Sequence, residues 1–449
     1  MGQISQAPNA QKYVKVYIEV ALLALLCVSQ YFGISIVNLA LTVAVLGIHF
    51  LMEDLEENVI GLFCALPVFN FLNANIGSTS MYYLMVFIFW LRYFQFHHGR
   101  ISKTKFLVLL GLLMIRLTSG EIKGTLTWFV LVSVLVLTFG EDFFDRNIQQ
   151  VVMFTTIVFL LSSLSGYFML KAGKSIYTNG NVWVGTVRST RFAGIIGDAV
   201  FFSQFCSLLV SANLALGCYN KKYLVLSLIF SGCCLALCLE SYAKTGMLLI
   251  ILCLGASLAW FIWTRLKNKR TAILSIFLTF SSLIGLFMLI NYILTNNDNM
   301  VIQGYISRLS SDDLLTGRTK IWAHYISLLA DSWRSLFIAL PNSLLLKPFA
   351  LASNSSFNRT HNIFLETLCM FGIIPSLCMF TLVFVLMYRC FVSRKGILWQ
   401  MPICVMLASG FTLHGHMEFQ YYTLIALALS FLRCEKTHTQ VPPGQTPDF

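Results

Sequence analysis

The chain has 449 residues, of which 57% are hydrophobic and 11% are charged, and its mean hydropathy is +0.76. This much apolar surface excludes an ordinary soluble protein and indicates a polytopic membrane protein. The formal net charge of +12 does not require a nucleic-acid partner, because Lys and Arg clustered in short cytoplasmic loops account for it.

Apolar runs follow one another along almost the whole chain. We predict them near residues 16–34, 35–51, 58–74, 79–95, 106–118, 125–139, 151–169, 198–216, 223–239, 246–263, 272–293, 363–388, 397–413 and 420–432. Runs of this length indicate an all-α fold with roughly 12 to 14 transmembrane helices. The first run has no cleavage site of small residues, so we interpret it as an uncleaved helix that also targets the protein.

The charges of the loops predict how the chain crosses the membrane. Alternate loops carry basic clusters: Arg92, Arg100, Lys103 and Lys105; Lys221 and Lys222; Arg265, Lys267, Lys269 and Arg270; Arg389, Arg394 and Lys395. The positive-inside rule places these loops, and both termini, in the cytoplasm. The predicted organisation is therefore a transmembrane bundle over residues 1–293, a large periplasmic loop with short amphipathic helices over 294–361, further transmembrane helices over 362–433 and a disordered cytoplasmic tail over 434–449.

A few basic residues fall on the predicted outer side, against the orientation rule. Arg188 and Arg191 stand just before an apolar run, and Lys244 lies in a very short loop. Two arginines at a membrane surface suit a phosphate or pyrophosphate. The alternative is that they are interfacial anchors that bind lipid headgroups, and that Lys244 pairs with Glu240.

The long polar interval contains the next candidate, Arg318. Apolar residues recur at helical spacing after it, so we predict an amphipathic helix with Thr316 as its N-cap. Arg318, Trp322 and Tyr325 share one stripe of this helix. An anion there meets both the guanidinium and the free N–H groups of the first helical turn. In the alternative reading, Arg318 snorkels from an interfacial helix or pairs with a nearby aspartate.

His361 stands between a polar run and an apolar run that begins at Asn362. A histidine at a membrane–water boundary can take a proton from a hydroxyl near neutral pH. The alternative is a purely structural residue at the start of a helix, with Thr360 or Asn362 as the cap.

Other chemistry has little support in the sequence. We find no phosphate-binding loop and no zinc-protease motif. The 13 cysteines fall in predicted spans or inner loops, and their spacing resembles no metal site. We interpret them as small apolar packing residues, and we predict neither a cofactor nor a metal.

Three patches, in this order, resemble the bacterial O-antigen ligase and O-antigen polymerase family. Arg191-Phe-Ala-Gly194 followed by Asp198 resembles the R-x-x-G patch, and Gly317-Arg318 with Trp322 resembles G-R-x-x-x-W. The histidine-bearing patch is matched by Thr360-His361-Asn362 through Glu366 and the following Phe371-Gly-Ile-Ile-Pro375. The short S-x-x-R patch is matched only by Ser241–Lys244, where lysine keeps the charge but loses bidentate recognition.

The resemblance implies a substrate and roles for these residues. The donor is an undecaprenyl-pyrophosphate-linked glycan in the outer leaflet of the bacterial inner membrane, and the active site faces the periplasm. His361, Arg318 and Arg191 are the expected catalytic residues, and Arg188, Lys244, Arg308 and Asn362 are expected to bind substrate. The expected partners are this glycan, membrane lipids, a chain-length regulator and a flippase.

Three functions follow as alternatives. A polymerase joins lipid-linked repeat units into surface polysaccharide, and we favour it because this diverse group suits a loose match. A ligase transfers the same donor to lipid A-core. A lipid-linked oligosaccharide flippase would share the helices but place charges along a central path, and we expect the predicted spans to be nearly free of charge.

Overall fold

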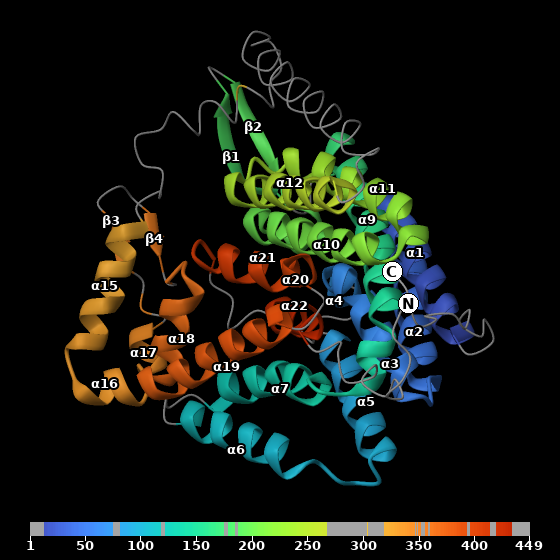
Figure 1. Cartoon of the computed structure of the whole chain (residues 1–449). Coiled ribbons are helices and arrows are strands. Elements are labelled where there is room, and N and C mark those ends of the chain that lie inside the picture. Colours follow the sequence, from blue (N-terminus) through green and yellow to red (C-terminus); the bar gives the residue numbers. More distant parts are fainter. Residues whose placement is uncertain are drawn as a thin grey trace.

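The fold is described here from a computed structural model. It describes residues 13–74, 81–117, 122–174, 178–184, 187–266, 303, 318–345, 347, 349–351, 355–357, 360–392, 396–413 and 419–432. Helices dominate these residues (Figure 1). The predicted apolar run at 272–293, the N-cap Thr316 and residue Arg308 lie outside them.

The N-terminal part of the chain is entirely helical among its described residues. It comprises α1 (Val14–Phe32), α2 (Ser35–Leu51), α3 (Leu55–Ala65), the short 3-10 helix η2 (Leu66–Val68), α4 (Phe69–Ala74), α5 (Met81–Phe96), α6 (Lys103–Leu117), α7 (Ile122–Thr138), α8 (Asp142–Arg146) and α9 (Ile148–Lys171).

The middle and C-terminal parts add two short hairpins to the helices. After α9 come β1 (Thr178–Val184), β2 (Val187–Phe192), η3 (Gly194–Ile196), α10 (Ala199–Tyr219), α11 (Lys221–Leu239) and α12 (Lys244–Leu266). The later elements are α15 (Arg318–Ala330), α16 (Trp333–Phe337), α17 (Asn342–Leu345), β3 (Phe349–Leu351), β4 (Ser355–Phe357), α18 (Ile363–Phe371), α19 (Ile373–Val392), α20 (Gly396–Trp399), α21 (Met401–Gly410) and α22 (Phe419–Ser430).

The helices fit an all-α membrane protein, as the sequence predicts. Within the described ranges, seven are long and apolar enough to cross a bilayer: Val14–Phe32, Leu55–Leu72, Ile148–Lys171, Ala199–Tyr219, Lys222–Leu239, Lys244–Phe261 and Ile373–Val392. Three shorter apolar helices are Ser35–Leu51, Trp128–Thr138 and Met401–Gly410. The total of roughly 12 to 14 spans stays a prediction.

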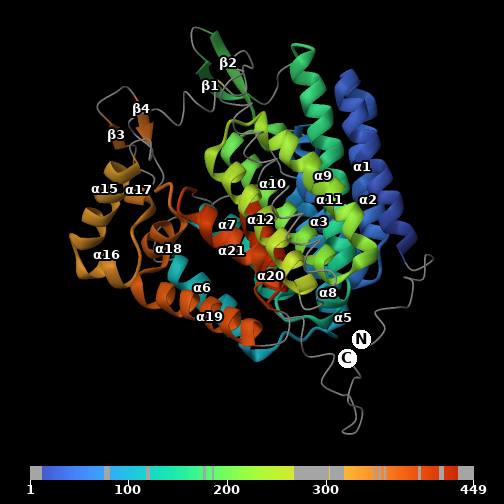
Figure 2. The same cartoon turned by 45° about the horizontal axis from the view of Figure 1, so that its top comes forward.

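Helix α10 lies at the centre of the bundle. Most of its side chains are apolar or small on every face, and every residue from Phe201 to Gly217 is buried. Helices α9, α11, α12 and α21 pack around it (Figure 2), as expected for a helix without a polar face. Its few polar side chains bond inside the bundle, where Gln204 Nε2 donates to Ser409 Oγ at 2.8 Å and Asn213 Nδ2 to Thr156 Oγ1 at 2.9 Å.

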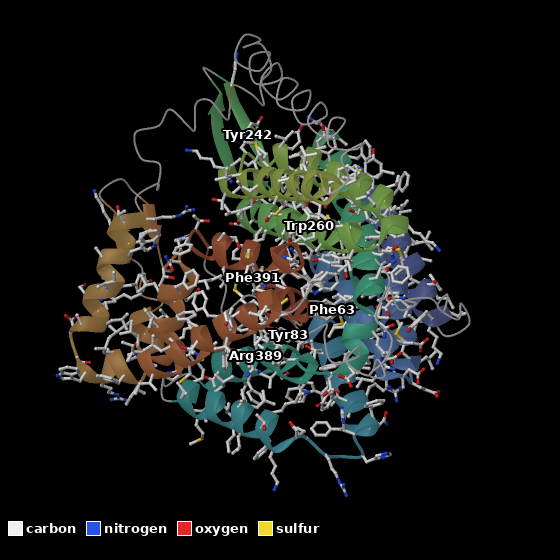
Figure 3. All side chains as sticks on the ribbon, in the orientation of Figure 1. Phe63, Tyr83, Tyr242, Trp260, Arg389 and Phe391 are labelled. Atoms are coloured by element: carbon white, nitrogen blue, oxygen red, sulfur yellow. The ribbon has the colours of Figure 1, made fainter. Side chains whose placement is uncertain are left out.

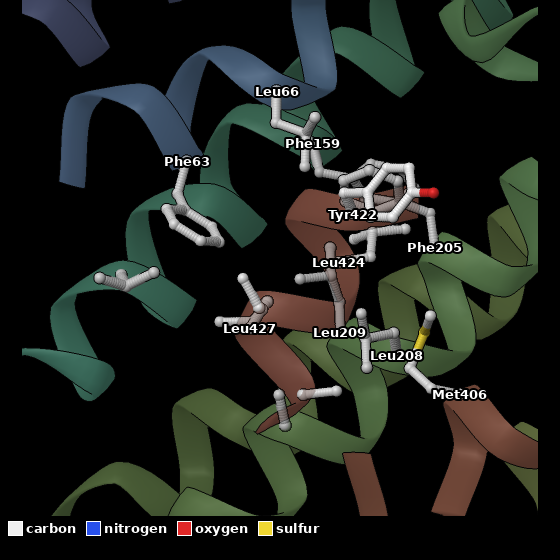
Figure 4. Close-up of a cluster of buried hydrophobic side chains, with 14 of the residues drawn as sticks. Phe63, Leu66, Phe159, Phe205, Leu208, Leu209, Met406, Tyr422, Leu424 and Leu427 are labelled. Carbon is white, nitrogen blue, oxygen red and sulfur yellow. The ribbon is translucent and has the colours of Figure 1, made fainter. Parts of the chain in front are cut away.

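Aromatic and aliphatic side chains from helices far apart in the sequence form the core (Figure 4). Phe159 of α9 stacks on Phe205 of α10, with ring centroids 4.9 Å apart. Figure 4 shows Tyr422 and Leu424 of α22 and Met406 of α21 in the same cluster. The two ends of the chain therefore share one core with the middle.

The predicted run at 363–388 is not one helix. Helix α18 ends at Phe371 and α19 begins at Ile373, so the chain breaks at Gly372. Gly372 has φ +75°, and a Cβ atom there would lie 2.3 Å from the carbonyl oxygen of Phe337. The backbone at the end of α16 therefore occupies the space that a side chain at position 372 would need.

Two antiparallel hairpins were not predicted. Strands β1 and β2 pair from Thr178 with Phe192 to Val184 with Val187, and β3 pairs with β4. The first hairpin carries Arg188 and Arg191. The second lies inside the predicted loop at 294–361, together with α15, α16 and α17.

Candidate functional site

Arg191 lies at the end of β2, where it contacts the loop between α11 and α12. Its Nε donates a hydrogen bond to the carbonyl oxygen of Ser241 at 3.1 Å, and the Phe192 amide donates to Glu240 O at 3.0 Å. The R-x-x-G patch and the Ser241–Lys244 patch are thus in contact, although about fifty residues separate them in the chain. Arg191 itself is only partly buried.

The residues after Arg191 fix its position. Gly194 has φ +56°, and a Cβ atom there would come within 2.6 Å of the Phe202 ring. Asp198 caps α10, with Oδ1 accepting from the amides of Val200 at 2.7 Å and Phe201 at 3.0 Å. Glycine and aspartate in this patch therefore have structural roles that hold β2 against the start of α10.

The loop that carries Lys244 is tightly held. Tyr242 adopts φ +51°, an uncommon backbone conformation for a bulky residue, and Figure 3 shows it at the foot of the hairpin. A Cβ atom on Gly246 would lie 2.4 Å from Ser203 Cβ, so α12 starts in direct contact with α10. Lys244 is the first residue of α12 and is partly buried. Arg191 contacts the loop between α11 and α12, and Lys244 directly follows that loop.

Arg318 is the first residue of α15, as the sequence predicts. The buried face of α15 consists of Ile321, Tyr325 and Leu329, and Trp322 is partly buried at its side. The Tyr325 hydroxyl donates to Leu345 O at 2.9 Å, and α15 packs against α18. This packing places the N-terminus of α15 on the same substructure as His361.

His361 lies two residues before the start of α18 and has φ +49°, which is uncommon for a residue with a side chain. Thr360 Oγ1 donates to Asn362 O at 2.9 Å and accepts from the Asn362 amide at 3.3 Å. Asn362 Oδ1 accepts from the Leu365 amide at 3.0 Å, so Asn362 caps the helix. The two neighbours are buried and His361 is partly exposed. His361 is therefore the most exposed of the three residues in this tight turn.

The C-terminal end of α21 connects these two groups. The Phe411 ring packs against Phe364 of α18, with centroids 4.7 Å apart. Thr412 Oγ1 donates to Thr245 Oγ1, next to Lys244, at 3.3 Å. The end of α21 thus contacts both the start of α12 and helix α18, and α15 packs against α18.

Some predicted residues cannot be placed in this arrangement. Arg188 lies on β2, but its side chain is not described, and Arg308 lies outside the described residues. Two further histidines that could act as a base, His414 and His416, lie a few residues after the end of α21 and are outside the described residues too. The oxygen of Asn362 is used in capping, and a substrate contact by this residue stays a prediction.

The structure also buries two charged residues to which the sequence assigned no role. Arg116 of α6 and Glu366 of α18 are both fully buried. Both lie within electrostatic reach of the Tyr422 hydroxyl, to which Trp128 Nε1 donates a hydrogen bond. Glu366 lies one turn after the Asn362 cap, so this cluster supports the helix that carries His361. The sequence signal for these buried residues was a lone charged residue within an apolar run: Arg116 in the run at 106–118 and Glu366 in the run at 363–388.

A second buried polar group joins the first three helices. Glu19 Oε2 lies 3.2 Å from His49 Nδ1, and Asn58 Nδ2 lies 3.1 Å from His49 Nε2. All three side chains are fully buried, and neither Glu19 Oε1 nor Asn58 Oδ1 has a hydrogen-bond partner. The predicted spans thus contain few ionisable residues, and Glu19 and His49 are buried within the bundle.

The described residues offer no obvious metal centre. Within them, no three His, Cys, Asp or Glu side chains gather as a metal site, and none of the twelve described cysteines forms a disulfide. An apolar groove lies between α5 and α7, on elements that carry no predicted site residue; it is lined by Tyr83, Phe87, Trp90, Leu126 and Val130.

Comparison with known proteins adds no assignment: no family model, no curated protein and no solved structure matches this chain.

Proposed function

We propose that the protein is a membrane-embedded glycosyltransferase that acts on a polyprenyl-pyrophosphate-linked glycan. One observation supports the proposal. Contacts link the segment of the R-x-x-G patch to the Ser241–Lys244 segment, and link both through the end of α21 to the helix that follows His361. A shared substrate would account for the proximity of segments that lie more than a hundred residues apart in the chain.

The proposed chemistry is an inverting transfer. The acceptor hydroxyl attacks C1 of the donor sugar while the bond from C1 to the pyrophosphate oxygen breaks. His361 takes the hydroxyl proton as general base. Arg318 at the start of α15, with Arg191 and Lys244, neutralises the charge that develops on the departing pyrophosphate. The donor is already activated, so this scheme needs no nucleotide.

The particular reaction we propose is the polymerisation of repeat units, with transfer to lipid A-core as the alternative. Both use the same donor and the same outer leaflet of a bacterial inner membrane, and they differ only in acceptor. A chain-length regulator and a flippase are the partners that such a polymerase requires. Deletion of the gene, followed by a gel of surface polysaccharide, separates the two: single repeat units on lipid A-core indicate a lost polymerase, and bare lipid A-core indicates a lost ligase.

The buried ionisable residues favour a second candidate, a lipid-linked oligosaccharide flippase. Glu19, His49, Arg116 and Glu366 lie inside predicted spans, where ionisable groups often mark a transport path. Each is packed away from solvent in the described structure, which suits a structural role better than a path.

A purified enzyme distinguishes the candidates. The protein in detergent is mixed with a synthetic lipid-linked donor and acceptor, and product is measured by mass spectrometry. A transferase gives product without two compartments, whereas a flippase gives none. Arg318→Ala should abolish the product, and Arg318→Lys should recover little, because a point charge does not replace the planar guanidinium.

Lys320→Ala is the matched control, since Lys320 is an exposed cation two residues further along α15. It should leave the rate unchanged. Equal losses in both variants would show a general effect of charge rather than a specific site at the helix start. Loss of product on adding a chelator would contradict the metal-free scheme.

A further inference from the structure

Helix α16 presents aromatic side chains that the described residues leave exposed. Trp333 is 78% exposed and Phe337 is 40% exposed. Their rings stack on each other, with centroids 5.6 Å apart, and no residue of α16 is buried. Ser332 caps the helix by accepting from the Ser335 amide at 3.1 Å. The two aromatic residues are therefore held together on an ordered surface, which needs a partner of its own.

The contacts of α16 fix its position relative to a membrane span. Helix α19 begins at Ile373, and its 20 residues have the composition of a span. A helix of this length covers roughly 30 Å, about the thickness of the hydrocarbon core, so Ile373 lies close to one boundary. Phe337 O contacts Gly372, directly before that start. The end of α16 thus lies at the depth where α19 enters the bilayer.

The lipid-facing surface of α19 continues to this point. Ile374 is 58% exposed and Leu377 55% exposed, in the first turns of the span. Figures 1 and 2 show α15 and α16 at the edge of the molecule, with α17 and α18 between them and the bundle. The exposed aromatic pair is therefore adjacent to the exposed apolar surface at the start of α19.

We propose that α16 is an interfacial anchor, in which Trp333 and Phe337 insert into the headgroup–acyl boundary on the side where α19 begins. Tryptophan favours this boundary because its ring is apolar and its N–H is polar. Arg334, exposed on the same short helix, reaches the lipid phosphates. The anchor would hold α15 and α18 at the membrane surface, and it does not depend on the reaction proposed above.

Depth-dependent quenching tests the anchor. An environment-sensitive fluorescent amino acid replaces Trp333 by codon suppression in the full chain, which avoids labelling the native cysteines. The protein is placed in vesicles of phosphatidylethanolamine and phosphatidylglycerol. We expect a blue-shifted emission, strong quenching by lipids with a nitroxide near the top of the acyl chain and weak quenching by iodide. The same probe at Lys320, exposed on α15, should show the opposite pattern.

Two outcomes would overturn the proposal. Emission typical of water, with strong iodide quenching, would show that Trp333 faces solvent. A blue shift without quenching by lipid nitroxides would show that protein covers the pair, either a partner or part of the chain outside the described residues. Neither outcome depends on catalytic activity, so failure of the anchor is distinguishable from failure of the proposed transferase.

Discussion

At the residue scale, the backbone of His361 is as informative as its side chain. Its φ of +49° costs energy for a residue other than glycine, and such strain concentrates at functional sites. Thr360 and Asn362 hold the turn on both sides through the hydrogen bonds described above. This arrangement is consistent with a base whose direction matters more than local stability.

Substitution of His361 tests that role. His361→Asn keeps a residue that tolerates the left-handed conformation but removes the base, so the fold should persist while transfer falls by a factor of about 10² to 10⁴. Donor binding, measured separately from turnover, should be retained. Full activity in His361→Asn, with activity lost in His416→Asn, would instead identify His416 as the base.

The Glu19–His49–Asn58 group makes a prediction about stability. Removing one partner of a buried hydrogen-bonded pair leaves an unsatisfied polar group, which costs about 1–3 kcal/mol. Glu19→Ala should therefore lower the unfolding temperature in detergent markedly. Glu19→Gln keeps the shape and an acceptor for His49 Nδ1, so it should cost less. Equal unfolding temperatures for wild type and Glu19→Ala would show that the group contributes nothing to the bundle.

The sequence predicted the positions of Arg318 and His361 well, because each stands where a polar interval meets a helix. It did not predict the buried partners of the helices. One glutamate in a run of apolar residues barely lowers the hydropathy, and its pairing with His49, thirty residues away, depends on how α1 packs against α2.

At the element scale, the break between α18 and α19 predicts an unusual cost for a small substitution. Gly372→Ala combines a positive φ with a clash against the Phe337 carbonyl, and strain and overpacking each cost about 1–3 kcal/mol. Thermal unfolding should show this loss, and transfer should fall as α18 moves.

Gly47→Ala in α2 is the matched control, because a Cβ atom there has nothing within 4 Å. Alanine is the better helix former, so this variant should be neutral or slightly stabilising. A Gly372→Ala protein as stable as Gly47→Ala would mean that α16 does not press against this junction.

Helix starts and ends were predicted closely wherever polar residues interrupt the apolar runs. The prediction of one continuous helix from 363 overlooked a local signal, since Pro375 has no N–H to donate to the carbonyl of Phe371. Gly372 ends α18 with a positive φ, and the contact with Phe337 comes from a distant segment. The β1–β2 hairpin was missed for a similar reason, since the Glu240 carbonyl binds the end of β2 from outside the strand pair.

At the scale of the whole molecule, contacts sort the helix ends into two groups. Lys174 Nζ donates to Tyr31 O, and the Arg191, Thr245 and His361 regions meet at the end of α21 as described. At the other ends, the Tyr219 ring packs against Trp399 at 5.2 Å, and Tyr13 bonds to Asn147 at 2.7 Å. In Figure 1 the start of α12 and the end of α21 lie toward the left. The alternation of sides predicted from the loop charges stays a prediction.

The topology prediction is tested with reporter fusions. The positive-inside rule assigns the basic clusters at 221–222 and 389–395 to the cytoplasm and the segment at 294–361 to the periplasm. Fusions of alkaline phosphatase at Ser310 or Ser356 should therefore be active, as expected in the periplasm. Alkaline phosphatase fused at Lys267 or Ser393 should be inactive. Green fluorescent protein fused at the same two positions should be fluorescent, as expected in the cytoplasm. A cytoplasmic signal at Ser356 would place His361 on the side of the membrane opposite its donor, and the transferase proposal would have to be abandoned whatever the outcome for single residues.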